Sequence, residues 1–402
     1  MEHTPTLLIT VTGQDRPGVT AAMFDALSTF TVEVLDIEQL VLRGRLVLGI
    51  LVTAPRDGAK LSQAMGDAAA AMSMEVEIEQ GQGDNRRRRD GRAHVTVLRR
   101  PLVPGAVAAM AGRICDTGAN IDRVVRMARY PVTAIEFQVS GANIDQLRAV
   151  LATEAVAQQA DVAVQKMGLL RQGRRLIVMD VDSTLIQDEV IDLLAEHAGA
   201  RSQVAEVTER AMRGELDFEQ SLRARVALLE GLDAGCLDKV YDACQLAPGA
   251  ETMVRTLTRL GYRFAIVSGG FSAVTDRLAR DLGIHYAKAN ELEVAEGRLT
   301  GRIVGDVVDR AAKAAALRGF AADSKISLDR TVAIGDGAND LDMLSEAGLG
   351  IAFNAKPMVQ EQAHTALNVP YLDAIMYLLG ISREDIEAAD REFGIETPHP
   401  DL

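Results

Sequence analysis

The chain has 402 residues, of which 48% are hydrophobic and 25% charged, and this composition excludes a wholly disordered or fibrous protein. Its 57 acidic side chains outnumber the 43 basic ones and give a formal charge of −14, so we expect no binding to nucleic acid or to a membrane. The length predicts two or three domains.

The N-terminal part contains one pattern twice, over residues 6–53 and 93–140. In each copy an alternating apolar strand runs into a Pro-Gly pair, and an amphipathic helix and two more alternating segments follow. Pro presets φ for a first helical turn, and Gly permits close backbone approach. Second helices over 60–71 and 144–158 would close the copies, so the sequence predicts βαββαβ twice.

Between the copies lies an arginine-rich stretch with four consecutive arginines. A nucleic-acid patch is one interpretation, but no aromatic residues are interleaved. A solvated, flexible linker is favoured. The predicted boundaries are a first domain over 1–84, a linker over 85–92 and a second domain over 93–168.

A third domain is predicted over 174–402 from three strands, RRLIVMDVDST, YRFAIVSGGF and RTVAIGDGAND. Uniformly apolar strands separated by helices indicate a parallel sheet covered on both faces, with ligands at its carboxyl edge. The strand-free stretch over about 190–247 predicts a helical cap above that edge. Residues 381–402 are acidic and predict one helix followed by a loose tail.

Asp180 and Asp182 follow the first of these strands. Alternate residues at a strand end point to one side, so both carboxylates can reach one point. Such a pair suits a divalent cation, or a nucleophile working beside a general acid/base. The alternative is a helix start at which these side chains only cap backbone N–H groups.

Polar clusters also end the other two strands. Ser268-Gly269-Gly270 offers a hydroxyl and backbone N–H groups as an anion cradle, and the segment 335–340 adds Asp336, Asn339 and Asp340. Each cluster alone could be an ordinary turn. Their occurrence in one chain, on three strand ends of one sheet, favours a single active site.

This series of motifs resembles the haloacid dehalogenase superfamily of phosphatases. The resemblance implies an α/β fold, a Rossmann-like parallel sheet with an inserted helical cap. It implies that Asp180 is the nucleophile and Asp182 the general acid and then base. It also implies Mg²⁺ on Asp180, Asp336 and the backbone carbonyl of Asp182, with Asp340 orienting these ligands from behind. The phosphoryl group would be held by Ser268, Gly269, Lys313 and Asn339, although Lys313 by its own context reads as a solvated helix lysine.

Over about 174–375, cap included, the chain resembles the phosphoserine phosphatase family. This resemblance implies hydrolysis of O-phospho-L-serine to L-serine and phosphate, the last step of serine biosynthesis. By motif position Glu189 would take the substrate ammonium and Arg225 its carboxylate, while Met212 and Phe218 would close the pocket. Without the resemblance, the two charged residues read as surface charges and the two apolar residues as core.

The N-terminal repeats resemble ACT domains, ferredoxin-like modules that often bind amino acids at domain interfaces. The first copy carries Asp15-Arg16-Pro17-Gly18, but the second, around Gly105, lacks the acidic residue. The resemblance implies a regulatory site near Asp15, Gly18 and Gly105, with L-serine as the obvious effector. It also implies a homo-oligomer, a dimer or higher.

Other functions stay open at this point: a relative acting on another small phosphomonoester, a phosphotransferase, an amino-acid sensor with a vestigial core, or an interaction protein built on the repeats. The three cysteines (Cys115, Cys236, Cys244) have no metal-type spacing, and no secretory signal is visible. We therefore expect a cytoplasmic protein without disulfides or zinc.

Overall fold

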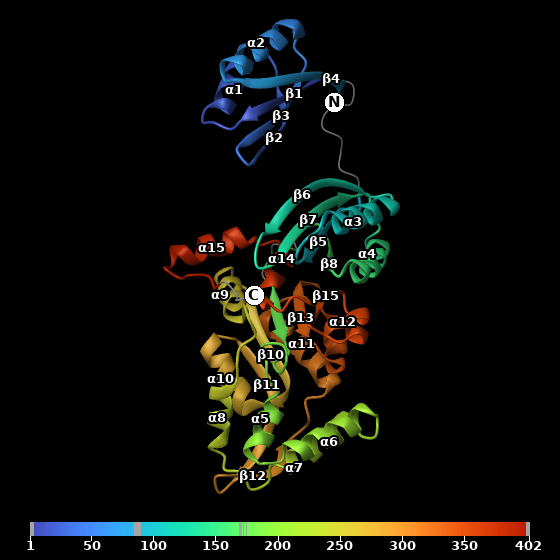
Figure 1. Ribbon diagram of the computed structural model, residues 1–402, viewed down its shortest axis with the longest axis vertical. Helices are drawn as coiled ribbons and strands as arrows, with labels where there is room; N and C mark the ends of the chain where they lie inside the picture. Colours follow the sequence, from blue (N-terminus) through green and yellow to red (C-terminus); the bar gives the residue numbers. More distant parts are fainter. Residues whose placement is uncertain (1–3, 84–89, 169–170, 172, 174, 399–402) are drawn as a thin grey trace. The chain divides into compact units, whose positions relative to one another are not determined.

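The computed structural model describes residues 4–83, 90–168, 171, 173 and 175–398. The chain divides into two compact units, Met1–Arg89 and Asp90–Leu402, which are described separately below. Figure 1 labels their helices and strands. Among the described residues, no helix combines the length and the apolar character needed to span a bilayer.

The first unit is one βαββαβ module, as the sequence predicts. Its sheet is antiparallel in the order β2-β3-β1-β4. Alternate residues of β1, among them Ile9 and Val11, are fully buried against both helices and form the core. The elements are β1 (Pro5–Gln14), α1 (Val19–Ser28), β2 (Val34–Leu42), β3 (Arg45–Thr53), α2 (Gly58–Ala71) and β4 (Met74–Gln82).

The second unit opens with the same module, in the sheet order β6-β7-β5-β8. It begins earlier than predicted: the Met167 amide donates to the Arg92 carbonyl (2.9 Å) and the Gly141 amide to the Asp90 carbonyl (2.7 Å). The end of the predicted linker therefore belongs to this module, while 84–89 lie outside the described residues. The elements are β5 (Ala93–Arg99), α3 (Pro104–Asp116), β6 (Asn120–Ala128), β7 (Thr133–Ser140), α4 (Ile144–Gln158) and β8 (Asp161–Lys166).

The third module contains a seven-stranded sheet in the order β12-β11-β10-β9-β13-β14-β15. All neighbours run parallel except β11 and β12, which form a hairpin through Glu296 and Gly297, both at positive φ. Sequence reasoning missed this hairpin, because its strands alternate in burial and lack a continuous apolar run. The strands are β9 (Leu176–Met179), β10 (Arg263–Phe271), β11 (Tyr286–Ala295), β12 (Arg298–Val304), β13 (Thr331–Gly335), β14 (Leu349–Phe353) and β15 (Thr365–Leu367).

Helices cover both faces of this sheet, which explains why its central strands are uniformly apolar. In β9, Ile177 and Met179 join one buried cluster, whereas Leu176 and Val178 join another. The first cluster contains α9 (Ala250–Arg259) and α10 (Ser272–Leu282). The second contains α11 (Arg310–Ser324), α12 (Leu341–Glu346) and α13 (Pro357–Gln362).

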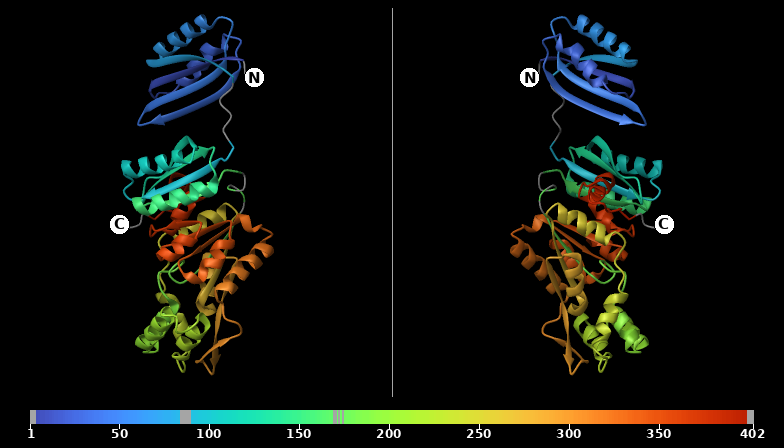
Figure 2. Two further views of the ribbon diagram at one scale, coloured as in Figure 1. Left: turned by 90° about the vertical axis from the view of Figure 1, so that its right-hand side faces the viewer. Right: turned by 90° about the vertical axis from the view of Figure 1, so that its left-hand side faces the viewer.

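The stretch between β9 and β10 is helical, as predicted, and forms the cap. Figures 1 and 2 show its helices gathered beside the β11–β12 hairpin, at the end of the third module away from the second module. Asp217 and Gln220 form a capping box that fixes the start of α7. The cap helices are α5 (Val190–His197), α6 (Arg201–Met212), α7 (Phe218–Ala227) and α8 (Cys236–Ala243).

The predicted C-terminal helix is present, but the residues that follow it, up to residue 398, are not the loose tail that the sequence suggested. Helix α15 (Arg383–Glu392) is followed by a turn in which the Thr397 hydroxyl donates to Asp390 (2.9 Å). Asp390 is fully buried and also pairs with Arg255 and Arg259, each at 2.7 Å. These ion pairs tie the chain down as far as the end of its described part.

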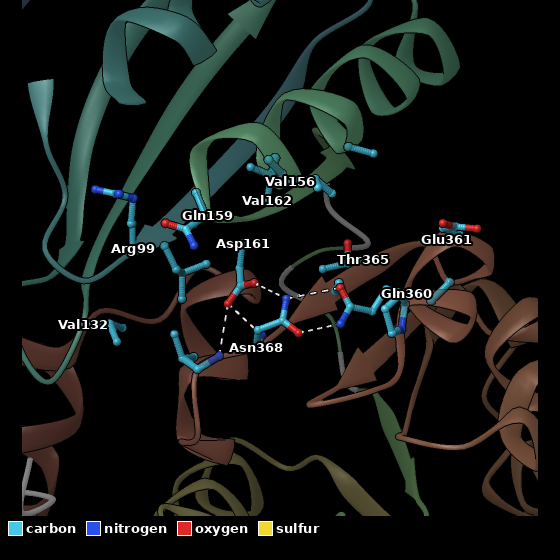
Figure 3. A pocket seen from close by; sticks show the side chains of 18 of the residues that line it. Arg99, Val132, Val156, Gln159, Asp161, Val162, Gln360, Glu361, Thr365 and Asn368 are labelled. Atoms are coloured by element: carbon cyan, nitrogen blue, oxygen red, sulfur yellow. Dashed lines mark hydrogen bonds between the residues drawn. The ribbon is translucent and has the colours of Figure 1, made fainter. Parts of the chain in front are cut away.

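The second module packs directly on the third. Asp161 at the start of β8 accepts hydrogen bonds from the backbone and side-chain nitrogens of Asn368, both at 2.8 Å (Figure 3). Gln165 donates to the carbonyl of Leu378 at 2.6 Å, at the end of α14 (Ile375–Leu378). Apolar residues such as Val132 complete this junction as part of the buried cluster that contains Ile177 and Met179.

Candidate active site

The ends of three strands converge on one edge of the catalytic sheet. Met179 of β9 is in register with Ile266 of β10 and with Ile334 of β13. The residues that follow therefore meet, and both Asp180 and Asp336 line a cavity of about 510 Å³ between this edge and the cap. The register explains how motifs far apart in the sequence form one site.

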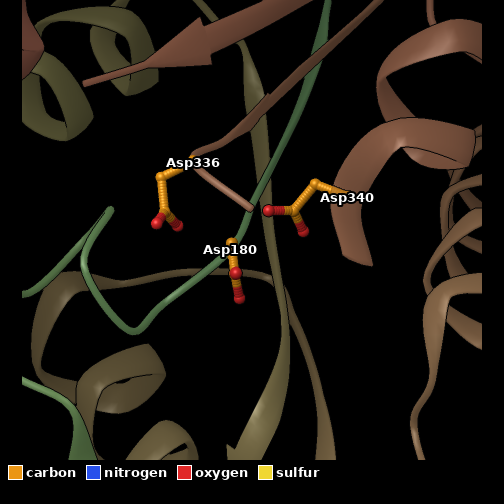
Figure 4. A group of neighbouring side chains, drawn as sticks. All are labelled: Asp180, Asp336 and Asp340. Atoms are coloured by element: carbon orange, nitrogen blue, oxygen red, sulfur yellow. The ribbon is translucent and has the colours of Figure 1, made fainter. Parts of the chain in front are cut away.

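Three carboxylates form an acidic cluster at this edge: Asp180, Asp336 and Asp340 each place an oxygen within 4.8 Å of the others (Figure 4). Burial, reinforced by Asp340, raises the pKa of Asp180 well above its usual range and that of Asp336 to about 6. The cluster is thus short of positive charge. Oxygen ligands with this deficit fit a hard divalent cation such as Mg²⁺.

Asp340 therefore lies within the acidic cluster itself. The sequence analysis expected it behind the residues that would bind Mg²⁺. The Asp182 carboxylate lies outside the cluster and has other partners. Its two oxygens accept from the Val190 amide (2.8 Å) and the Ser268 hydroxyl (2.9 Å). Burial is the main reason that the pKa of Asp182 is raised, which favours a carboxyl group that can carry a proton.

Lys313 is fully buried, so the interpretation of a solvated helix lysine is wrong. Its ammonium lies 2.8 Å from an oxygen of Asp180 and 2.7 Å from an oxygen of Asp340. Burial alone would lower the pKa of Lys313, but Asp180 and Asp340 outweigh it and raise the pKa above its ordinary value. Lys313 is therefore a fixed positive charge beside Asp180.

Glycines let the backbone approach the acidic side chains closely. A Cβ on Gly270 would lie 2.6 Å from an Asp182 oxygen, and a Cβ on Gly335 would lie 2.4 Å from the carboxyl carbon of Asp340. Any larger residue at either position would displace a carboxylate. The two glycines are therefore part of how the site is built.

The cap supplies the opposite wall of the cavity, including Glu189, Met212, Phe218 and Arg225. Met212 is 70% exposed and lies at the mouth, whereas Phe218 is partly buried and packs against the core. Burial lowers the pKa of Arg225, and its buried Nε has no hydrogen-bond partner among the described residues. A guanidinium without a full set of partners, on a residue that lines a cavity, fits an anionic ligand.

Glu189 carries the complementary charge. Burial, followed by the nearby Asp182, raises its pKa to about 7. Its side chain still reaches solvent through the cavity, where the Ser183 hydroxyl donates to it at 2.8 Å. Gly269 and Asn339, the remaining sequence-predicted residues, line the same cavity.

Sequence reasoning missed three residues that support the site. The buried Thr184 donates to Asp336 (3.2 Å), and the buried Asn290 donates to the Gly269 carbonyl (2.7 Å) and accepts from the Val308 amide (2.7 Å). Lys356 lines the cavity. Only Thr184 had a sequence signal, because it ends the same DVDST motif.

The residues predicted for a regulatory site are not among those that line this cavity. Asp15 and Gly18 occupy an exposed turn before α1, where the Asp15 amide donates to the Gly44 carbonyl (2.7 Å) and Gly18 has φ 95°. Gly105 is exposed in the first turn of α3. The structure thus gives the two copies different backbone geometry at matching positions.

Comparison with known proteins agrees with this architecture. The fold and the strand-end cluster define a haloacid dehalogenase-like hydrolase, and the model of that family matches residues 177–345. Models of the ACT domain match residues 5–79 and 92–165.

Relatives that match along almost the whole chain identify the family within this class of hydrolases. The chain is 59% identical over 388 residues to a phosphoserine phosphatase of Streptomyces coelicolor, covering 96% of this chain and 95% of the relative. It is 49% identical to one of Mycobacterium tuberculosis, with the same coverage. A solved structure of a probable phosphoserine phosphatase from Vibrio cholerae matches 74% of this chain and 88% of its own, with TM-score 0.58 and 35% identity. The chain therefore belongs to the phosphoserine phosphatase family, in the form that carries two ACT domains.

Proposed function

We propose that this enzyme hydrolyses O-phospho-L-serine to L-serine and inorganic phosphate through an aspartyl-phosphate on Asp180. The observation that carries the proposal is the content of one cavity. It joins the buried cluster around Asp180 and Lys313 to Glu189 and Arg225 on the cap. Phosphatase chemistry and recognition of an amino-acid zwitterion thus meet in one place.

The cap residues suit the two charges of the serine moiety. The unpartnered Nε of Arg225 can donate to the substrate carboxylate, for which a guanidinium is the best matched group. Ionised Glu189 can accept from the substrate ammonium. Met212 and Phe218 would cover the bound molecule, and exclusion of water would strengthen these interactions.

Phosphoryl oxygens would be held by Ser268, Gly269, Lys313 and Asn339. The Lys313 ammonium offsets the negative charge that Asp180 and the phosphoryl group bring together. Such positioning and charge stabilisation supply most of the catalysis in phosphoryl transfer.

In the first step an Asp180 oxygen attacks phosphorus, and the bond between phosphorus and the serine oxygen breaks. Asp182, which holds a proton because of its raised pKa, donates that proton to the leaving serine oxygen. In the second step water attacks the phosphorus and gives a proton to Asp182. The bond between phosphorus and Asp180 then breaks, which releases phosphate and restores both aspartates.

The acidic cluster fits Mg²⁺, as its geometry and charge deficit indicate. Asp180 and Asp336 would hold the ion together with the backbone carbonyl of Asp182. Asp340 would orient these ligands. When bound, the cation supplies positive charge that stabilises the phosphoryl oxygens.

The proposal extends to regulation and cellular role. The reaction would be the last step of serine biosynthesis in the cytoplasm. L-Serine would act as effector at the ACT domains near Asp15, Gly18 and Gly105, in a homodimer or larger homo-oligomer. Serine inhibition that stayed purely competitive and survived removal of residues 1–165 would contradict the effector role.

The test is phosphate release from O-phospho-L-serine with Mg²⁺ and with EDTA, beside O-phosphothreonine and p-nitrophenyl phosphate. A strong Mg²⁺-dependent preference for phosphoserine is expected. Activity on the generic ester alone would keep the aspartate chemistry but discard the substrate. No phosphate release from any ester would refute the enzyme function.

A further inference from the structure

A second cavity, of about 920 Å³, lies between the second ACT domain and the catalytic domain (Figure 3). Helix α4 and strand β8 form one wall, and α13 and β15 form the other. Both walls belong to the same compact unit. The cavity is separate from the catalytic cleft, and its size falls in the range of small-molecule sites.

Most of the cavity wall is apolar. Val132, Val156 and Val162 line it from the ACT domain, and Ala363 and Val369 line it from the catalytic domain. Val156 is 79% exposed although it is a large aliphatic residue. Such a surface would be stabilised by an apolar group that excludes water from it.

Asp161 brings a buried negative charge to this apolar space, since only 6% of the residue is exposed. Its oxygens accept from three donors, the backbone and side-chain nitrogens of Asn368 and the Val369 amide (3.2 Å). All three donors are neutral, and Asp161 has no ion pair within the part of the chain that the structure describes. A carboxylate offers about four acceptor sites, so one further donor can bind.

Thr365 gives an independent sign of a missing ligand. It is 4% exposed and lines the same cavity, yet its hydroxyl has no hydrogen-bond partner among the described residues. Buried hydroxyls are nearly always bonded, because an unmet hydrogen bond is costly. Figure 3 shows this hydroxyl directed toward the space below α4.

None of the basic side chains that line the cavity in the described part of the chain pairs with Asp161. Arg99 is bonded to the carbonyls of Gln158 (2.7 Å) and Pro101 (2.8 Å), and Figure 3 shows its guanidinium on the side away from Asp161. Arg100 is exposed at the rim. His364 uses Nδ1 to accept from the Gly350 amide (2.9 Å), and burial, followed by Arg148, lowers its pKa and favours the neutral ring.

We propose that this cavity binds a small amphipathic amine, with its ammonium on Asp161 and Thr365 and its apolar part against the aliphatic wall. The cation would provide the ionic partner that buried Asp161 does not find among the described residues. A ligand with a carboxylate alone would meet repulsion from Asp161 and from Glu361 at the rim.

The same ligand would act on the catalytic cleft, a consequence that rests on the proposed function. Pro357 and Gln360 of α13 line the ligand cavity, and Lys356, which caps the start of that helix, lines the cleft. A ligand that shifts α13 by contact on one side would therefore move Lys356 on the other. The amine would thus be an effector whose site shares no residue with the exposed turn at Asp15.

Binding is tested first, on the full chain and without phosphoserine. Hexylamine, hexanamide and hexanoate share one apolar chain but carry positive, no and negative charge. Calorimetry should show saturable binding of hexylamine, and hexanoate should bind at least about tenfold more weakly. Absence of hexylamine binding, or a preference for hexanoate, would overturn the proposal.

Two variants test whether hexylamine binds in this cavity. Asp161→Asn should abolish the preference for hexylamine over hexanamide. Because this change also touches the domain junction, Val156→Trp, at an exposed position, provides a second test by filling the mouth of the cavity. It should weaken hexylamine binding, whereas Ala149→Trp, on α4 outside the cavity, should not. Equal binding to both tryptophan variants would place the ligand elsewhere and refute the site.

Phosphoserine turnover is then measured with and without hexylamine. A change of about fivefold in KM or kcat that disappears in Val156→Trp is expected if α13 couples the two cavities. Binding without any change in turnover would refute the coupling. A chain that binds hexylamine but never hydrolyses phosphoserine would refute the proposed function and leave the binding site intact.

Discussion

The catalytic cleft and the turn before α1 use the same local device, an acidic residue and a glycine between a strand and a helix. They differ in burial. In the cleft Asp180 is 4% exposed and Lys313 and Asp340 are fully buried, whereas Asp15 lies on the surface. Because buried charges destabilise a fold unless they are paired or serve a ligand, the cleft is where chemistry is expected. The exposed turn has no buried charge of this kind, so it is not expected to carry out chemistry.

Among the substitutions considered, Asp180→Asn is expected to have the largest effect on turnover. We expect phosphoserine turnover to fall by several orders of magnitude, because an amide cannot serve as the nucleophile. Asp342→Asn is the matched control: this half-buried residue pairs with Arg310, does not line the cleft, and should leave turnover nearly unchanged when substituted. Substantial activity in Asp180→Asn would show that Asp180 is not the nucleophile.

Arg225→Ala should separate recognition of the substrate carboxylate from the phosphatase reaction within the cleft. Loss of a charge-assisted bond of about 2–3 kcal/mol should reduce kcat/KM for phosphoserine by roughly thirty- to two-hundredfold. Hydrolysis of p-nitrophenyl phosphate should change little. Arg223→Ala, two residues earlier and paired with Glu219 on the surface, serves as control. Equal losses on both substrates would contradict a carboxylate-binding role.

The raised pKa of Glu189 predicts a pH dependence. Its ordinary value of 4.5 rises to about 7, so the ionised form is present above that pH and is lost as the pH falls through it. KM for phosphoserine should therefore rise below about pH 7. Glu189→Gln should have a high KM with only the residual slope of the phosphate group itself, which titrates near pH 6. Parallel KM profiles for both proteins would show that Glu189 does not bind the ammonium.

The smallest expected effect compares the two ACT copies. Gly18 has φ 95°, so Gly18→Ala should lower the free energy of unfolding by about 1–2 kcal/mol. Gly105 is helical and has open space around its Cα, so Gly105→Ala should be neutral or slightly stabilising. Thermal denaturation measures both. Equal shifts would mean that the matching Pro-Gly pairs are structurally equivalent after all.

The sequence was most informative where local pattern and tertiary structure agree. The apolar strand ending at Met179 and the repeated Pro-Gly pairs predicted the sheet and both βαββαβ modules. The cleft was predictable because each motif directly follows a strand. By contrast, the burial of Lys313 could not be predicted from the sequence. Its helix is rich in alanine, and burial depends on which face of that helix meets Asp180.

Other features depend on long-range packing that local pattern does not encode. Asn290 supports Gly269 from a neighbouring strand, and Asp161 joins two domains through Asn368, more than two hundred residues later. The C-terminal turn is fixed by the ion pairs of Asp390 with helix α9. Each of these polar groups reads as an ordinary surface residue until its partner is known.

The most direct test of the account is to trap the phosphoryl group on the protein. The enzyme is mixed with phosphoserine labelled in its phosphate, quenched in acid within one turnover, and digested. We expect label on the peptide that contains Asp180, and none on that peptide in Asp180→Asn. Rapid release of labelled phosphate with no labelled peptide at any time point, or label on another residue, would contradict it.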